Sequence, residues 1–225
     1  MQNEVKCSVK RQVKSKQRVV DHGEVFTAER EVKAMCDLVE TQCNNVDATF
    51  LEPACGDGNF LIEILKRKLD IVKVKYKKSV YDYERYSLLA LGSIYGVELL
   101  MDNTISCRER LFEYWNSEYK KISKKEYDNN TVDSAKFILE KNIVCGNALT
   151  LLKVDDDGND LKDPIVFSEW TFPFNDARMQ RKDYTFDELL NKKKNKSQQS
   201  LFNEDGVGKF LKQYIFHYKQ IRNGE

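Results

Sequence analysis

Apolar positions along the chain follow two alternating spacings, which predict helices and short strands in turn. Helical spacing, in which apolar residues recur every three or four positions, marks residues 29–39, 59–69, 80–92 and 102–121. Short continuous apolar runs, typical of buried strands, lie at 48–51, 93–99 and 142–145. Strands that alternate with helices predict an α/β fold whose parallel sheet has right-handed crossovers, the doubly wound class with an N-terminal helical segment.

The pattern is weaker beyond residue 150. Residues 164–168 predict one short strand, and the polar stretches 155–158 and 192–199 predict loops. Apolar residues at helical spacing over 207–221 predict a C-terminal amphipathic helix, which either packs on the domain or docks onto a partner chain. The predicted organisation is a basic arm at 1–20, one domain at 21–175, and a polar linker with the C-terminal helix at 176–225.

Composition supports a globular chain with few special features. Of 225 residues, 41% are hydrophobic and 32% charged, and the 37 Lys and Arg nearly cancel the 36 Asp and Glu. Net charge therefore gives no argument for nucleic acid. Within the arm, however, six basic residues face the single acid Glu4, so the arm either meets DNA phosphates or is an ordinary solvated terminus.

Metal and membrane sites are not expected. The six cysteines form no Cys-x-x-Cys pair, and with two histidines no zinc-ligand spacing can be assembled. No apolar run approaches the roughly 20 residues of a membrane span, and the basic N-terminus lacks the apolar stretch of a secretory signal. We therefore expect a reduced, soluble, cytoplasmic protein.

The segment with the clearest chemistry is the nonapeptide 52–60, Glu-Pro-Ala-Cys-Gly-Asp-Gly-Asn-Phe, between a predicted strand and a predicted helix. Gly56 and Gly58 supply φ freedom and let a ligand approach the backbone closely. Glu52 and Asp57 place negative charge where a phosphate-binding loop would avoid it, so the loop favours a cationic ligand. S-adenosylmethionine, which carries an ammonium and a sulfonium, has this character.

The whole nonapeptide resembles motif I of the S-adenosylmethionine-dependent DNA adenine N6 methyltransferases, in the gamma-class motif order found in restriction-modification systems. The resemblance implies a Rossmann-like methyltransferase fold over residues 21–175, DNA as the partner, and S-adenosyl-L-methionine as the cofactor. By this resemblance the cofactor contacts within the nonapeptide come from Glu52, Ala54, Gly56, Asp57, Gly58 and Phe60.

Flanking segments extend the resemblance. Residues 22–27 resemble the motif that precedes motif I in the gamma class, which implies that Phe26 packs on the cofactor and Thr27 bonds its methionine end; Ala28 replaces the proline often found next. Glu98, followed by Leu99, ends the second predicted strand, where a carboxylate can accept bonds from both ribose hydroxyls. Glu98 is roughly twice the customary ~20 residues from the glycines, so a solvated strand-end carboxylate is the alternative.

A third segment resembles motif III of the family. Residues 145–149 end the third predicted strand, and the resemblance places Asn147 and Ala148 at the adenine ring of the cofactor. Many relatives have Asp at the position of Asn147. The amide can still bond the exocyclic amine, but a purely structural turn is the alternative reading.

The catalytic tetrapeptide of the family, Asn or Asp followed by Pro-Pro-Tyr or Pro-Pro-Phe, is absent. The three prolines, Pro53, Pro164 and Pro173, are never adjacent. The tetrapeptide binds the target amine and stacks on the flipped base, so its loss removes positioning and electrostatic stabilisation, and no catalytic residue is assigned. The alternative to an enzyme is a non-catalytic or truncated cofactor-binding subunit completed by a partner chain.

The same absence has a consequence for the sheet. In the family fold the fourth strand pairs with the first, so a chain that lacks it leaves the strand before motif I with an open edge and the fold incomplete. We expect this edge to be covered by the C-terminal tail, by a second polypeptide or by another copy of the chain.

Overall fold

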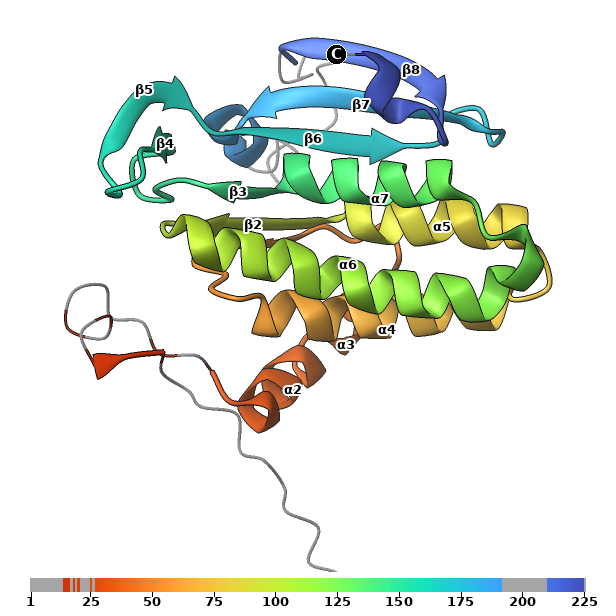
Figure 1. The fold of residues 1–225 in the computed structure, drawn as a ribbon, viewed down its shortest axis with the longest axis horizontal. Coiled ribbons are helices and arrows are strands. Elements are labelled where there is room, and N and C mark those ends of the chain that lie inside the picture. Colours follow the sequence, from red (N-terminus) through yellow and green to blue (C-terminus); the bar gives the residue numbers. More distant parts are fainter. Residues whose placement is uncertain are drawn as a thin grey trace, which may run out of the picture.

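Three parallel strands form the central sheet of a mixed α/β fold (Figure 1). The computed structural model describes residues 14–16, 18, 20, 25, 27–191 and 210–224. The strands β1 (Phe50–Glu52), β2 (Ile94–Glu98) and β3 (Ile143–Cys145) lie in the order β1-β2-β3, with Leu51 opposite Tyr95 and Val97 opposite Val144. All three strands predicted before residue 150 are therefore present, and their parallel pairing is confirmed.

Helices pack against one face of this sheet, and two further helices lead directly into its strands (Figure 1). They are α2 (Glu29–Asp37), α3 (Glu40–Cys43), α4 (Asn59–Tyr76), α5 (Val80–Gly92), α6 (Met101–Ser123), the short 3-10 turn η1 (Lys124–Glu126) and α7 (Asn129–Asn142). Figure 1 shows α5 and α7 running into β2 and β3 in the middle layer, with α4 and α6 below. Helix α7 was not predicted.

Helix α4 includes most of the lysine-rich stretch 66–78 and ends at Tyr76, beyond the predicted end at residue 69. The side chain of Lys68 in this helix is buried, and its ammonium donates to the carbonyl oxygens of Asn45, Val46 and Ala48 and to Oγ of Ser93. Burial lowers the pKa of Lys68 to about 8. One lysine of α4 thus holds the segment that leads into β1.

A second, antiparallel sheet covers the other face of β2. It consists of β6 (Val166–Thr171), β7 (Arg178–Thr185) and β8 (Lys212–His217), and a hairpin of β4 (Leu152–Val154) and β5 (Asp160–Pro164) precedes it. Residues 155–158 form the hairpin turn, as predicted, while 192–199 lie outside the described residues. The core between the two sheets is made by Tyr95, Val97, Ile165, Phe167, Tyr184, Phe186 and Leu189.

The predicted C-terminal helix is wrong. Residues 212–217 form β8, which pairs with β7, and a short 3-10 turn η2 (Ile221–Gly224) follows. Along β8 the half-buried Tyr214 and Phe216 alternate with the exposed Ile215 and His217, which is the two-residue period of a strand. The boundary predicted at residue 175 lies between β6 and β7, which pair with each other; the division into domains stays a prediction.

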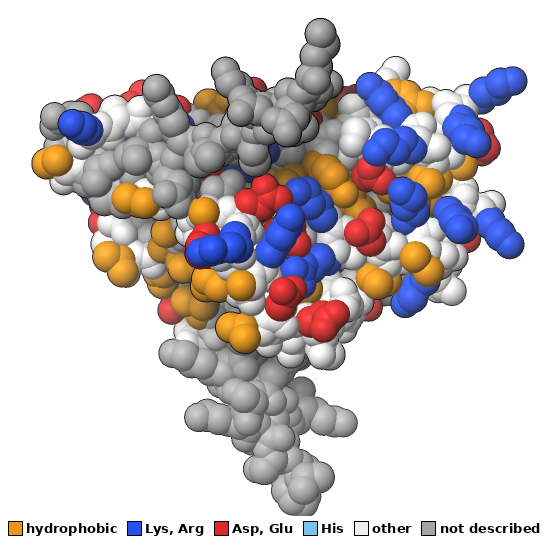
Figure 2. All heavy atoms as spheres, turned by 90° about the horizontal axis from the view of Figure 1, so that it is seen from below, with side chains coloured by type: hydrophobic (Ala, Val, Ile, Leu, Met, Phe, Trp, Pro, Cys, Tyr) orange, Lys and Arg blue, Asp and Glu red, His pale blue; other side chains and the backbone are white. Residues whose placement is uncertain are grey.

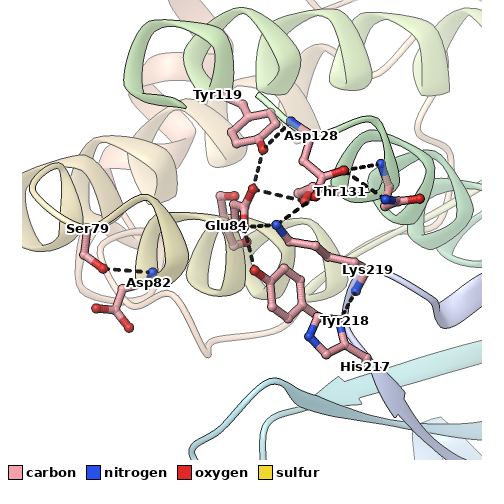
Figure 3. A network of polar contacts seen from close by, with 11 residues as sticks. Ser79, Asp82, Glu84, Tyr119, Asp128, Thr131, His217, Tyr218 and Lys219 are labelled. Atoms are coloured by element: carbon pink, nitrogen blue, oxygen red, sulfur yellow. Dashed lines mark hydrogen bonds and ion pairs between the residues drawn. The ribbon is translucent and has the colours of Figure 1, made fainter. Parts of the chain in front are cut away.

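A buried polar network ties the C-terminal segment to the helices (Figure 3). The Glu84 carboxylate on α5 accepts hydrogen bonds from Tyr119 on α6, Thr131 on α7 and Tyr218 after β8, and it pairs with Lys219 at 2.9 Å. Glu84 is only 1% exposed. Tyr218 and Lys219, which lie beyond residue 175, are therefore joined to the helices by buried polar contacts.

Strand β1 lies at the edge of its sheet. Within the part of the chain that the structure describes, β1 pairs with β2 alone, and its three residues are half-buried, whereas all five residues of β2 are buried. The tail strand β8 pairs with β7, so it does not cover β1. The expected open edge is present among these residues, and what covers it stays a prediction.

Two residues of the basic arm contact the protein surface. Arg18 donates to both carboxylate oxygens of Asp102 at 2.8 and 3.0 Å, and Lys14 donates to the same side chain at 3.0 Å. Asp102 is in the first turn of α6. These hydrogen bonds, that of Arg18 first, hold the pKa of Asp102 well below its usual range, although burial opposes them.

Acid should therefore weaken this contact. Because the folded-state pKa of Asp102 is depressed, its stabilisation is fully present above the ordinary aspartate value near 4 and is lost as pH falls through the folded value. We expect Asp102→Asn to lower the free energy of unfolding at pH 7 by at most about 1 kcal/mol, since the side chain is 54% exposed. Urea denaturation of both proteins at decreasing pH should show this difference vanish; a difference that grows would contradict the assignment.

Candidate functional site

A cavity of about 530 Å³ opens at the carboxyl ends of the parallel strands. In parallel sheets this edge is where ligands commonly bind. Ten of the residues predicted from the sequence line the cavity: Thr27, Glu52, Ala54, Gly56, Asp57, Phe60, Glu98, Leu99, Asn147 and Ala148. Phe26 lies outside the described residues, and Gly58 is buried and does not line the cavity.

The loop between β1 and α4 depends on its two glycines. Gly56 and Gly58 adopt φ values of 53° and 89°, in the left-handed region that favours glycine. A Cβ added to Gly58 would lie 2.6 Å from Sγ of the buried Cys107 on α6. The predicted need for φ freedom is confirmed, and at Gly58 the close neighbour is the protein's own helix α6.

Glu98 braces this loop from the end of β2. Its Oε2 accepts from the backbone N–H of Gly56 at 2.9 Å, and its Oε1 accepts from the backbone N–H of Leu100 at 3.1 Å and from Nδ2 of Asn103 at 3.3 Å. The residue is 8% exposed. The solvated alternative is therefore excluded, and the carboxylate joins the glycine loop to the start of α6 while it lines the cavity.

The two acids of the loop differ in their surroundings. Asp57 pairs with Arg110 of α6 at 2.6 Å through Oδ2, while its buried Oδ1 accepts no hydrogen bond among the described residues. Burial raises the pKa of Glu52, and a hydrogen bond involving the backbone of Ala54 only partly opposes it. Much of the expected negative charge at Asp57 is thus neutralised by Arg110, and Glu52 remains as a desolvated acid in the cavity wall.

Asn59 joins Thr27 to the glycine loop, a role that was not predicted from the sequence. Its Nδ2 donates to the Thr27 carbonyl oxygen at 3.1 Å, and its Oδ1 accepts from Nη2 of Arg110 at 2.9 Å. Arg110 also donates to the Asp57 carbonyl oxygen. Thr27 is therefore held at the cavity, as predicted, by contacts between residues far apart in the sequence.

The third segment is folded as a turn. Nδ2 of Asn147 donates to Oδ1 of Asp160 at 3.0 Å, and its Oδ1 accepts from the backbone N–H of Leu149 at 3.0 Å. These bonds use the amide donor and acceptor that the resemblance assigns to adenine, which favours the structural alternative for Asn147. Its place in the wall, beside Ala148, is nevertheless as predicted.

Further wall residues were not singled out from the sequence. They are Val25, Pro53, Cys55, Asn59, Leu100, Asn103, Gly146 and Leu149. Most of them are next to predicted residues in the sequence, so the motifs already indicated where these wall residues would lie. Asn103 is buried in the first turn of α6, and its bond to Glu98 identifies it as part of the site.

Metal-binding groups and membrane-spanning helices are not seen in the described part of the chain. No group of three or more His, Cys, Asp or Glu side chains there could hold a metal ion. None of the described helices is both long and apolar enough to cross a membrane.

Comparison with known proteins gives no relative. The chain matches no protein-family model, no curated protein and no solved structure. The resemblance to the methyltransferase motifs is therefore untested by these comparisons, and the functional reading depends on the residues of the cavity.

Proposed function

We propose that the chain is an S-adenosylmethionine-binding protein of the DNA adenine N6 methyltransferase family, with a Rossmann-like methyltransferase fold. The observation that carries the proposal is the meeting of three separate sequence segments at one cavity. Residues 52–60, 98–99 and 147–148 lie far apart in the sequence. The first and last of these segments resemble cofactor-binding motifs of that family, and Glu98 ends a strand where a carboxylate can accept bonds from ribose hydroxyls. The cavity volume of about 530 Å³ lies within the range of ~300–1,000 Å³ that is typical of small-molecule sites.

The wall fits the proposed cofactor in charge. Oδ1 of Asp57 is a buried acceptor without a hydrogen bond among the described residues, and Glu52 is a desolvated acid, so both favour an ammonium group. Helix α4 has no side-chain cap and no acid in its first turn, so its first N–H groups suit the cofactor carboxylate. When bound, the cofactor supplies a sulfonium methyl group. Glu98, through its bond to the Gly56 N–H, and Asn59, through its bond to the Thr27 carbonyl oxygen, would hold the backbone around the cofactor in place.

The alternative function is a non-catalytic or truncated subunit completed by a partner chain. Two observations favour it: the chain has no Pro-Pro dipeptide, and β1 is an edge strand among the described residues. A strand added along β1 by a partner would bring new residues beside the cavity, since β1 leads directly into its loop.

Cofactor binding can be tested by thermal unfolding. At ~100 times the dissociation constant, S-adenosylmethionine or its demethylated product should stabilise the protein by about 2.7 kcal/mol. This corresponds to an increase of roughly 5–10 °C in Tm for a domain of this size. ATP is the control, because its triphosphate meets the acidic loop and should give no increase. If neither S-adenosylmethionine nor its demethylated product increases Tm, both proposed functions are overturned.

An assay of labelled methyl transfer to adenine-rich DNA then distinguishes an active methyltransferase from a non-catalytic or partner-dependent subunit. The missing tetrapeptide leads us to expect no transfer by the chain alone. Transfer by the chain alone would show that other residues replace the tetrapeptide and would exclude the partner-dependent alternative.

A further inference from the structure

A second cavity, of about 790 Å³, lies on the outer side of β3. Helices α6 and α7, the β4–β5 hairpin and the antiparallel sheet all contribute to its wall. Five of its lining residues are cations, namely Arg108, Lys141, Lys153, Arg181 and Lys212, and only Glu140 and Asp183 are acids. The whole chain has a net charge of only +1, so this is a local concentration of positive charge.

Both acids are already paired. Asp183 receives two hydrogen bonds of 2.7 Å from Arg181 and one of 2.6 Å from Oγ of Ser168, so these two charges cancel inside the sheet. Glu140 pairs with Arg222, which does not line the cavity. The remaining cations of the wall therefore carry the charge of the cavity.

Arg108 is half-buried in this wall and has no carboxylate bonded to it in the described part of the chain. Its Nε donates to the Ile143 carbonyl oxygen at 2.8 Å and its Nη2 to the Glu140 carbonyl oxygen at 3.2 Å, which orient the guanidinium without neutralising it. Lys153 and Lys212 are exposed, and no ion pair joins either to an acid among those residues. An anion in the cavity would stabilise all three.

We propose that this cavity binds the phosphodiester backbone of a single nucleic-acid strand. The unneutralised cations Arg108, Lys153 and Lys212 come from three separate elements, α6, β4 and β8, so they suit contacts with more than one phosphate. Tyr214 adds a half-buried ring to the wall, and the guanidinium of Arg181 stacks on it at 4.9 Å from the ring centroid. A cationic groove with an aromatic surface is the common arrangement for single strands.

This cavity adjoins the candidate cofactor cavity. Met101 and Cys145 line the one, while their chain neighbours Leu100 and Gly146 line the other. A strand bound here would thus pass beside the end of β3. Binding does not require the proposed cofactor, so it is measured in its absence, and failure of either proposal is seen separately.

The test is fluorescence anisotropy with a labelled oligothymidylate of about twelve nucleotides, within the ~4–16 nucleotides of single-strand sites. For Lys153→Gln with Lys212→Gln, we expect the Kd to rise about tenfold or more. The salt slope of log K should shrink by about 1.4, as two phosphate contacts are lost. Both side chains are exposed, so Tm should not change.

The matched control removes two lysines elsewhere. Lys75 and Lys77, at the end of α4, are also exposed, and the face that α4 and α6 present carries basic side chains interspersed with acidic ones (Figure 2). Lys75→Gln with Lys77→Gln should leave the Kd within about twofold. An equal loss in both double variants would overturn the proposal, as would no binding by the unmodified chain. Thymidine monophosphate competing as strongly as the oligomer would overturn it too, because it would indicate a mononucleotide site.

Discussion

Glu84→Gln is expected to lower the free energy of unfolding by about 3 kcal/mol, the largest effect of a single polar substitution in this protein. The carboxylate accepts from Tyr119, Thr131 and Tyr218 and pairs with Lys219 (Figure 3). An amide replaces one acceptor oxygen by a donor, which leaves buried donors without a partner and Lys219 with less charge compensation. Urea denaturation followed by circular dichroism measures the change.

Glu140→Gln is the matched control. The same substitution there breaks an ion pair with Arg222 whose two side chains are 46% and 51% exposed, so it should cost no more than about 1 kcal/mol. Tyr218→Phe removes one donor of the Glu84 network and should have an intermediate cost of roughly 1–2 kcal/mol. If Glu84→Gln and Glu140→Gln cost the same, the network does not stabilise the fold as described.

Gly58→Ala is expected to lower the free energy of unfolding by roughly 2–4 kcal/mol and to abolish the thermal shift with S-adenosylmethionine. Two costs add at this position: a left-handed backbone with φ of 89°, and a Cβ 2.6 Å from Sγ of Cys107. Cys107 is 0% exposed and short, so its thiol cannot move aside freely. The distortion would pass to Gly56 and the cavity.

Gly158→Ala separates these two costs. Gly158, in the β4–β5 turn, has a similar φ of 83°, but an added Cβ would be 3.9 Å from its nearest neighbour, Leu99. This variant should therefore cost only about 1 kcal/mol and retain the shift. Equal effects of the two substitutions would show that backbone strain alone, and not the contact with Cys107, limits Gly58.

The first half of the fold follows from local sequence patterns. Helices α2, α5 and α6 and the three parallel strands begin and end close to the predicted positions, because their buried apolar side chains leave a clear pattern in the sequence. Helix α4 begins at the predicted residue but ends at Tyr76, beyond the predicted end at residue 69. Strand β7 shows why the later part was not recognised. Its buried positions include Arg181 and Asp183, which satisfy each other, so its inward face reads as polar.

In the candidate site, too, the residues at strand ends could be predicted from the local sequence, whereas contacts between distant residues could not. The glycine loop, Glu98 and Asn147 were found because each lies at or just after the end of a strand, and parallel strands end at one edge of the sheet. Arg110 could not be found in this way. It reaches Asp57 and Asn59 from the middle of α6, and nothing in its sequence surroundings indicates that contact.

The position of Lys219 and Tyr218 also bears on how the chain is made. Glu84 is separated from Tyr218 by 134 residues, yet Tyr218 and Lys219 complete its hydrogen bonds and charge pairing. During synthesis, α5 must wait until those late residues leave the ribosome before its central carboxylate is fully compensated. Until then the charge of Glu84 in the helical layer is uncompensated, so stable packing of the helices depends on this contact between distant parts of the sequence.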